Sequence, residues 1–186
     1  YPETMYMIGA EFGNWVWDSE DVVEMVPVNG MEGMFWCTRQ FTADQGFKFC
    51  SVREWNGEFS TLGESDVTVE GGNLVVKENG LYTVVVDLAG NKVSVKKAEV
   101  YGIGDAFGSW DAGTPFTINE DGTATITTTA ASADGGVRMY TAVEGADWWR
   151  TEYIVLDGKI VYRGNGNDQE RVAVTAGQTV TLDFNA

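Results

Sequence analysis

A ten-residue motif occurs twice in this chain, and this repeat restricts the fold more than any other feature. Residues 6–15 read YMIGAEFGNW and residues 101–110 read YGIGDAFGSW, so both follow the pattern Y-x-I-G-x-x-F-G-x-W. A repeat of about 95 residues is too long for a solenoid unit and has the size of a small domain. The sequence therefore predicts two domains of one kind, Tyr1–Glu99 and Val100–Ala186.

The similarity of the two halves extends beyond the motif. Gly46–Cys50 (GFKFC) matches Gly136–Tyr140 (GVRMY), and the segment from Leu74 to Gly80 matches the segment from Arg171 to Gly177. The spacing between these blocks differs in the two halves, so the length changes fall between the matched strands. Loops of a duplicated β-domain are expected to diverge in this way.

The composition favours sheet over helix. Val, Thr and aromatic residues are abundant, and no long stretch has apolar residues at helical spacing. Short apolar segments separated by turn residues such as Asp121-Gly122 and Asp157-Gly158 are typical of antiparallel sandwiches. One hairpin is expected between Gly33–Thr42 and Gly46–Arg53. The other expected strands are Thr4–Phe12, Val22–Val28, Leu74–Val76, Leu81–Leu88, Lys92–Lys97, Val100–Phe107, Phe116–Asn119, Thr123–Ala130, Gly136–Thr141, Glu152–Leu156, Ile160–Tyr162, Arg171–Val174 and Thr179–Phe184.

The charge and the missing histidine exclude several functions. The formal net charge is −16, which disfavours nucleic acid and anionic membranes as partners, so we expect a neutral or cationic ligand. The chain has no histidine, which removes Ser-His-Asp and Cys-His catalysis and imidazole-bound metals. Clusters of Asp and Asn show no EF-hand spacing, and we predict neither a metal nor a cofactor.

Cys37 and Cys50 are the only cysteines, which excludes a disulfide framework and a four-cysteine zinc site. They lie on the two strands of the expected hairpin, so a cross-strand disulfide is one alternative. Packing of two small buried residues is the other, and we favour it.

The chain is rich in tryptophan, with seven residues, and most of them lie in Gly- and Asp-rich segments expected to be loops. Such a tryptophan either folds over the core or presents its ring to a ligand. For Trp15 and Trp110 both alternatives stay open, and for Trp55, Trp148 and Trp149 we favour exposure. Because adjacent side chains of an extended segment point to opposite sides, we expect Trp148 or Trp149 to lie in the core.

Lys48 and Arg138 occupy matching positions, each between apolar residues. Strand alternation therefore predicts that both point away from the core, on the outer face of a sheet. A flat aromatic ring beside a side chain with several hydrogen-bond donors suits a pyranose, which has an apolar C–H face and a rim of hydroxyl groups. The alternative is that both cations are solubilising or ion-paired residues.

The carboxylates do not point to an enzyme. They are too numerous to single out a glycosidase pair, and we expect none in an apolar environment that would raise its pKa. We therefore predict a non-catalytic protein, with a glycoside hydrolase as a remote alternative.

The two motifs, the Lys48 and Arg138 strands, the tryptophans that follow them and the closing strand GLYTVVVD resemble the tandem domains of the SusE/SusF-like family. These are glycan-binding outer-membrane lipoproteins of starch-utilisation-type systems in Bacteroidetes. The resemblance implies immunoglobulin-like, antiparallel β-sandwich domains that bind glycan without cleaving it. It places ligand-binding residues at Trp15, Lys48, Trp55, Trp110, Arg138 and Trp148 or Trp149.

The resemblance also implies a setting. We expect this chain to be a piece of a longer protein anchored at the cell surface, with its anchor outside the sequence, and we expect this fragment to be a monomer. Its expected partners are starch-type or other neutral polysaccharides and neighbouring outer-membrane glycan-uptake proteins. The alternative is a pair of structural spacer domains that have lost glycan binding.

Overall fold

The computed structural model describes residues 1–186, which divide into two compact units, Tyr1–Lys97 and Ala98–Ala186. We call them the first unit and the second unit and describe each by itself. Every sheet in both units is antiparallel, and each unit contains two sheets. The predicted all-β fold of two tandem, immunoglobulin-like sandwiches is confirmed. The helices are two short 3-10 turns, and neither has the length or apolar character needed to cross a lipid bilayer.

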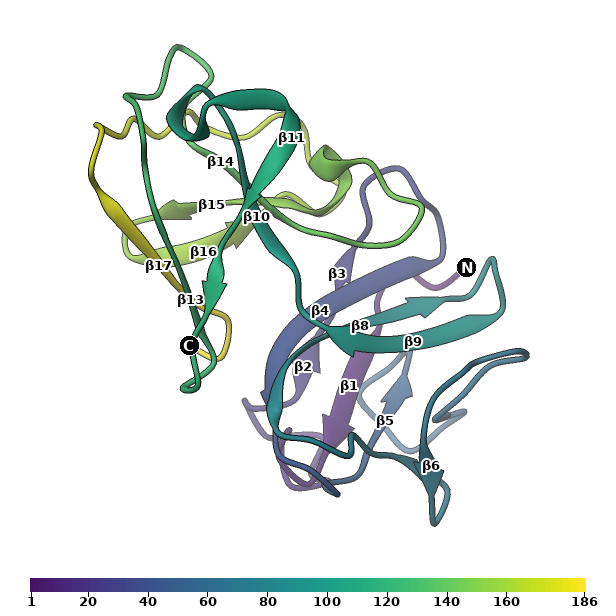
Figure 1. Ribbon diagram of the computed structural model, residues 1–186. Coiled ribbons are helices and arrows are strands. Elements are labelled where there is room, and N and C mark those ends of the chain that lie inside the picture. The colour runs from purple at the N-terminus through teal and green to yellow at the C-terminus, as the bar shows by residue number, and fades with distance from the viewer. The chain divides into compact units, whose positions relative to one another are not determined.

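The first unit packs a five-stranded sheet against a four-stranded sheet (Figure 1). The five-stranded sheet has the order β2 (Val23–Glu24), β1 (Tyr6–Gly9), β5 (Phe47–Cys50), β7 (Asn73–Leu74) and β6 (Val69–Glu70). The four-stranded sheet has the order β3 (Val26–Pro27), β4 (Met34–Phe41), β8 (Gly80–Asp87) and β9 (Lys92–Lys97).

The predicted hairpin between the cysteine-bearing strands is wrong. β4 pairs with β3 and β8, whereas β5 pairs with β1 and β7, so residues 42–46 carry the chain from one sheet to the other. The backbone N–H groups of this corner bond outside both strands: that of Ala43 donates to Asn79 Oδ1 and that of Asp44 to the Val76 carbonyl. Hairpin turns and corners use the same turn-forming residues, and for this reason the sequence did not separate them.

The two cysteines therefore lie in different sheets. Both thiols are free and buried, which confirms the packing interpretation and excludes the cross-strand disulfide. Burial raises the pKa of the Cys37 thiol to about 12, so at neutral pH it stays protonated and unreactive.

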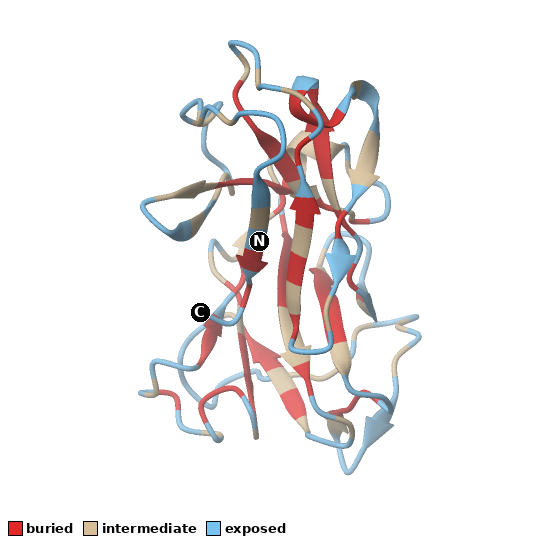
Figure 2. Cartoon of the chain, turned by 60° about the vertical axis from the view of Figure 1, so that its left-hand side comes forward, coloured by how far each residue is buried: buried red, intermediate tan, exposed pale blue.

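Strand alternation gives the first unit two apolar clusters. Met7, Phe47 and Phe49 face the main core between the sheets, whereas Ile8 and Cys50, one residue further along their strands, face the opposite side. There Trp17 and Val22 cover them, forming a smaller cluster on the outer face of the five-stranded sheet, which we call the outer face of the first unit. Buried residues are concentrated in the strands in Figure 2, and most loops are exposed.

The second unit packs a five-stranded sheet with a three-stranded one. The larger sheet has the order β11 (Ser109–Pro115), β10 (Val100–Gly104), β14 (Arg138–Thr141), β15 (Glu152–Leu156) and β16 (Lys159–Tyr162). The smaller has the order β12 (Thr117–Ile118), β13 (Thr123–Thr127) and β17 (Thr179–Asp183). The 3-10 turns are η1 (Asp105–Phe107) and η2 (Trp148–Thr151).

The two Asp-Gly turns join β12 to β13 and β15 to β16, as predicted. The strand predicted at Arg171–Val174 does not form. This segment bonds to its neighbours at isolated points only, such as the Val137 N–H donating to the Val172 carbonyl at 2.7 Å.

Two positions of the repeated motif have the same structure in both units. Its second glycine is in the left-handed region in each copy, at φ 84° for Gly13 and 87° for Gly108. The phenylalanine before it is 6% exposed in each, at Phe12 and Phe107. The duplication is therefore preserved at this glycine and this core phenylalanine. The backbone around them differs, because only the second copy forms a 3-10 turn, η1, and only Trp15 of the two motif tryptophans has a positive φ.

Candidate functional site

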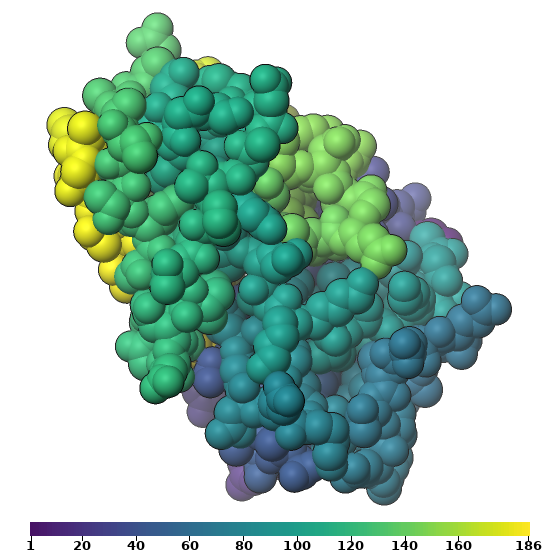
Figure 3. Space-filling model, in the orientation of Figure 1, coloured from purple at the N-terminus to yellow at the C-terminus, as the bar shows by residue number.

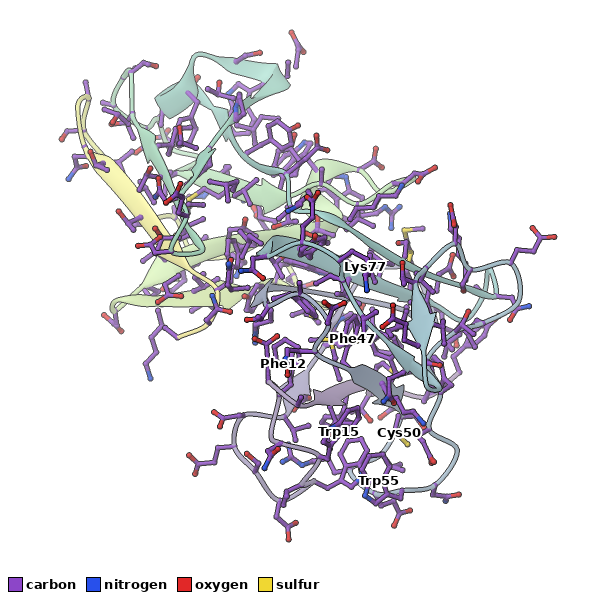
Figure 4. All side chains as sticks on the ribbon, turned by 60° about the horizontal axis from the view of Figure 1, so that its bottom comes forward. Phe12, Trp15, Phe47, Cys50, Trp55 and Lys77 are labelled. Carbon is purple, nitrogen blue, oxygen red and sulfur yellow. The ribbon has the colours of Figure 1, made fainter.

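The three residues expected to bind in the first unit gather on its outer face. The rings of Trp15 and Trp55 lie 6.3 Å apart between centroids, at an interplanar angle of 31° (Figure 4). Trp55 is 51% exposed, as predicted, and Trp15 is half-buried. The two rings form an aromatic surface on the face to which Lys48 of β5 also points, and we call this the first site.

Trp17 and Arg53 hold the two loops of the first site together. The buried Trp17 ring packs edge-on against Trp55 with 5.2 Å between centroids. The Arg53 guanidinium donates hydrogen bonds to the carbonyls of Trp17 and Ser19 at 2.5 and 2.8 Å. The loop that carries Trp55 is thus tied to the loop that carries Trp15.

Trp15 is held in an unfavourable backbone conformation. Its φ is 63° and that of Asn14 is 47°, so both lie in the left-handed region. For a bulky residue this conformation is rare, costs about 1–3 kcal/mol and is often found at functional sites. A Cβ on Gly46 would lie only 3.3 Å from the Trp15 ring, so the absence of a side chain there lets the ring rest close to the backbone.

The Lys48 side chain has no partner within the chain. Lys48 lies opposite Ile8 in the β1–β5 ladder and is half-buried, and its side chain makes no ion pair or hydrogen bond. A Lys48 ammonium without a partner in the chain leaves its three donors available.

The second unit carries a matching tryptophan pair on the outer face of its larger sheet. Trp110 is 44% exposed, and its ring lies 6.3 Å from that of Trp148, between centroids. Its indole N–H donates a hydrogen bond to Asp105 at 3.2 Å. Cβ atoms on Gly104 and Gly135 would lie 2.9 and 3.4 Å from the Trp110 ring, so this ring too rests on bare glycine backbone. We call this pair and its surroundings the second site.

Neither Trp148 nor Trp149 lies in the core, so the expectation that one of them is buried there is wrong. The segment is the 3-10 turn η2 rather than extended chain, and both side chains are half-buried. The guanidinium carbons of Arg150 and Arg163 lie 4.3 and 5.5 Å from the Trp149 ring centre. Trp149 is therefore occupied by cation–π contacts, and Trp148 is the ring paired with Trp110.

Arg138 is not the exposed cation that its position predicted. It pairs with Ile103 as Lys48 pairs with Ile8, but it is only 7% exposed. Its guanidinium donates to Glu152 at 3.1 Å and to Asp168 at 2.7 Å, and its Nε–H donates to the Gly135 carbonyl at 2.8 Å. Two carboxylates and a carbonyl occupy the donors that were expected to serve a ligand.

Glu152 is an acid whose pKa is raised by burial, which also differs from expectation. Its side chain is fully buried, but Arg138 and Arg163 contact its oxygens at 3.1 and 3.4 Å. The contact with Arg138 in turn holds the pKa of Asp168 below its ordinary value. The three side chains Arg138, Glu152 and Asp168 form one ion network, in which Arg138 and Glu152 are buried and Asp168 is half exposed.

Two aromatic residues of the second site were missed in the sequence. The Tyr140 ring lies 6.2 Å from the Trp148 ring and 5.3 Å from the Tyr101 ring, with which it is stacked. The signal was present: Tyr140 follows Arg138 by two positions, so alternation places both on one face of β14.

Other features of the surface contain none of the seven predicted residues. A hollow of about 290 Å³ in the first unit is lined by Asp66, Leu74, Glu78, Tyr82 and Val95 among others. No cluster of three or more acidic or cysteine side chains is arranged to hold a metal ion.

Two β-sandwich units, each with a tryptophan pair on the outer face of one sheet, are the architecture of tandem carbohydrate-binding modules. The family described as "SusF/SusE starch specific CBMs" matches residues 4–96 and 99–186. The chain therefore belongs to the SusF/SusE family, and the resemblance seen in its motifs is confirmed.

Two comparisons give the relatedness in numbers. The chain is 35% identical over 204 residues to the Outer membrane protein SusF of Bacteroides thetaiotaomicron, an alignment that covers 98% of this chain and 42% of that protein. It superimposes on the crystal structure of SusF from Bacteroides thetaiotaomicron with a TM-score of 0.87 and 32% identity, covering 98% of this chain and 46% of that one. The chain spans less than half the length of these relatives.

Proposed function

We propose that this chain binds a neutral polysaccharide of the starch or maltooligosaccharide type without cleaving it. The observation that carries the proposal is the Trp15–Trp55 pair, an exposed aromatic surface on the face to which Lys48 points, on a scaffold of a starch-specific family. The apolar faces of consecutive glucose rings would stack on the two indoles. The free ammonium of Lys48 would donate hydrogen bonds to their hydroxyl groups.

The second site would bind by the same stacking with a different polar group. Trp110 and Trp148 supply the rings, while Arg138 is committed to Glu152 and Asp168. We therefore assign Arg138 a positioning role. Its Nε–H donates to the carbonyl of Gly135, which is one of the two glycines on which the Trp110 ring rests. Lys48 and Arg138 thus share a register position but not a function.

Shallow stacking sites of this kind are individually weak. Two of them in one chain can gain affinity for a polymer that reaches both, because the second binding event becomes intramolecular. We propose that the longer protein of which this chain is a part displays them at the bacterial outer membrane. The name of its relative, Outer membrane protein SusF, supports that location. Neighbouring outer-membrane glycan-uptake proteins and a monomeric state belong to the same proposal.

The exposure of the tryptophans weighs against the spacer alternative. Domains that serve only as spacers have no need to leave Trp55 51% and Trp110 44% exposed, because burying each ring would stabilise the fold. Glu152, the acid whose pKa is raised, does not favour the glycoside hydrolase alternative, because Arg138 and Arg163 both contact its carboxylate.

Native gel electrophoresis with amylopectin cast into the gel tests the proposal. The chain should be retarded, Trp55→Ala and Trp148→Ala should each relieve part of the retardation, and the double variant should migrate as in a gel without glycan. Truncation of a central interface tryptophan typically weakens binding by about 2 kcal/mol, or about 30-fold. Gels cast with dextran and with a β-glucan serve as controls for glycan type. Unchanged migration in every gel would refute glycan binding.

A further inference from the structure

We propose that Tyr101 and Tyr140 extend the second site by an additional subsite for the glycan chain, one that the first site lacks. The inference rests on the proposed function and assigns a longer binding surface to one of its two sites. Its evidence is the order of four aromatic rings, the glycine beneath them and the residue found at the same register in the first unit.

The four rings follow one another across the outer face. Successive centroids are 6.3 Å apart from Trp110 to Trp148, 6.2 Å from Trp148 to Tyr140 and 5.3 Å from Tyr140 to Tyr101. The tyrosines pair directly in the β10–β14 ladder and stack at an interplanar angle of 23°. The aromatic surface therefore continues past the tryptophan pair onto β14 and β10.

A bare glycine lets the tyrosines take this arrangement. A Cβ on Gly113 would lie 2.5 Å from the Tyr140 hydroxyl oxygen and 2.8 Å from the Tyr101 Cβ. Tyr140 thus reaches from β14 across β10 to β11, where Gly113 leaves room for its hydroxyl group. β11 is an edge strand whose residues 110–112 are exposed, and the segment lies on the visible surface of the second unit in Figure 3. Tyr101 and Tyr140 are both partly exposed.

The Tyr140 side chain has a polar group to offer as well as a ring. Its hydroxyl makes no hydrogen bond within the chain, although the ring is half-buried. Partial burial and the neighbouring Tyr101 raise the pKa of Tyr140, so the phenol stays protonated and can donate to a sugar hydroxyl at neutral pH. In the second site, where Arg138 is committed to carboxylates, this hydroxyl is an available donor.

The first unit has no equivalent surface. The residue that occupies the register of Tyr140 is Cys50, which pairs with Tyr6 as Tyr140 pairs with Tyr101. Cys50 is fully buried and donates from its thiol to the Asn56 carbonyl at 3.1 Å. The Arg53 guanidinium lies over the Tyr6 ring, 5.6 Å from its centre. The first site therefore ends at its tryptophans.

The experiment compares a short and a long ligand. Calorimetric titrations use the whole chain carrying Trp55→Ala, so that binding reports on the second site, with maltotriose and maltoheptaose as probes. In this background we expect maltoheptaose to bind more tightly than maltotriose. Adding Tyr140→Ala should weaken maltoheptaose binding about fivefold to tenfold, the range that about 1 kcal/mol of aromatic contact allows, and change maltotriose binding less than twofold.

Gly113→Ala and Tyr101→Ala provide independent variants if Tyr140→Ala does not fold. Gly113→Ala keeps both tyrosines but displaces the Tyr140 hydroxyl, and it should also lower affinity selectively for maltoheptaose. Tyr140→Phe keeps the ring and should retain most of the length dependence. Trp148→Ala, which removes the centre of the site, should weaken both ligands.

The outcomes separate the two proposals. If Trp148→Ala abolishes binding while the tyrosine and Gly113 variants change neither ligand, the subsite is refuted and the glycan site stands. If those variants weaken both ligands equally, the tyrosines support the tryptophan pair and form no subsite. If neither ligand nor amylopectin binds the unsubstituted chain, the proposed function fails and the subsite with it.

Discussion

The carboxylate of Asp168 lies 2.7 Å from the guanidinium of Arg138, so a side chain that is half exposed neutralises one that is almost fully buried. Asp168 lies on the loop after β16, and Arg138 lies on β14 beneath the second site. The contact fastens this loop over the sheet, and it occupies the donor with which Arg138 would otherwise have met a ligand.

Stability of the second unit should depend on the charge of Asp168. Its pKa is lowered from 3.8, chiefly by the hydrogen bond from Arg138. A lowered folded-state pKa means that the stabilisation is fully present above the unfolded-state value and is lost as the pH falls through the folded-state value. Asp168→Asn should therefore lower the melting temperature at neutral pH and have little effect in strong acid. Thermal unfolding followed by circular dichroism across this pH range measures it.

Asp134→Asn is the matched control, because the exposed Asp134 carboxylate forms no ion pair. Its melting temperature should follow that of the unsubstituted chain at every pH. A constant difference between Asp168→Asn and the unsubstituted chain down to strong acid would contradict the electrostatic explanation.

Removing the charge of Glu152, the other carboxylate that pairs with Arg138, should lower the free energy of unfolding more than Asp168→Asn does. Glu152 is fully buried between Arg138 and Arg163, so Glu152→Gln leaves buried guanidinium charge incompletely compensated. We expect a loss of about 3–5 kcal/mol in the free energy of unfolding of the second unit. Urea titration gives this value, and Arg138→Met combined with Glu152→Leu should recover much of it. Equal losses in the single and double variants would argue against uncompensated charge as the cause.

Adjacent tryptophans should differ in their effect on glycan binding. Trp148 pairs with Trp110, whereas Trp149 contacts the guanidinium groups of Arg150 and Arg163. In the Trp55→Ala background, Trp148→Ala should remove retardation in amylopectin gels, and Trp149→Ala should leave most of it. Trp149→Ala should instead lower the melting temperature, because its cation–π contacts are lost. The reverse result in the gels would assign the site to Trp149.

Alanine at the second glycine of each motif should destabilise the two units unequally. Gly108 has φ 87° and nothing near its missing Cβ, so Gly108→Ala introduces backbone strain alone, about 1–2 kcal/mol. Gly13 has φ 84°, and its Cβ would also lie 2.6 Å from a Val22 methyl group. Gly13→Ala should therefore cost more, which two separate unfolding transitions in calorimetry would resolve. Equal costs would mean that Val22 yields without penalty.

Arg53 offers a test of loop preorganisation. Arg53→Met removes the two hydrogen bonds to the Trp17 and Ser19 carbonyls but leaves both tryptophans of the first site in the chain. Amylopectin retardation through the first site, measured with Trp148→Ala in the background, should weaken several-fold because the loops must be ordered on binding. Arg171→Met, which changes an exposed arginine of the second unit, is the control. An unchanged affinity would show that the loops need no fastening.

The sequence predicted the features that repeat and missed those that depend on partners far along the chain. The duplication, the all-β fold and the exposure of Trp55 follow from local pattern. The corner between β4 and β5 does not, because it requires knowing that β4 pairs with β8 and β5 with β1. Turn-forming residues predict that the chain changes direction, but they do not predict in which sheet the next strand pairs.

Partners distant in the sequence also explain why Arg138 was wrongly predicted to be exposed. Alternation placed its side chain correctly on the face opposite Met139, but burial was set by Glu152 and by Asp168, 30 residues away. Lys48, in the matching position, has no such neighbours. Local pattern therefore fixed the direction of both cations, and only the tertiary structure distinguishes the free donor from the committed one.

Cys50 and Tyr140 occupy one register position in two copies of one strand, and their inward-facing neighbours remain apolar in both. After a gene duplication, such outward positions can change without disturbing the packing that keeps each copy folded. A tandem protein of this design can therefore diversify what each half recognises while its folding requirements stay the same. Successive mutations on one side of two strands would be enough to turn a pair of identical receptors into a pair with different preferences.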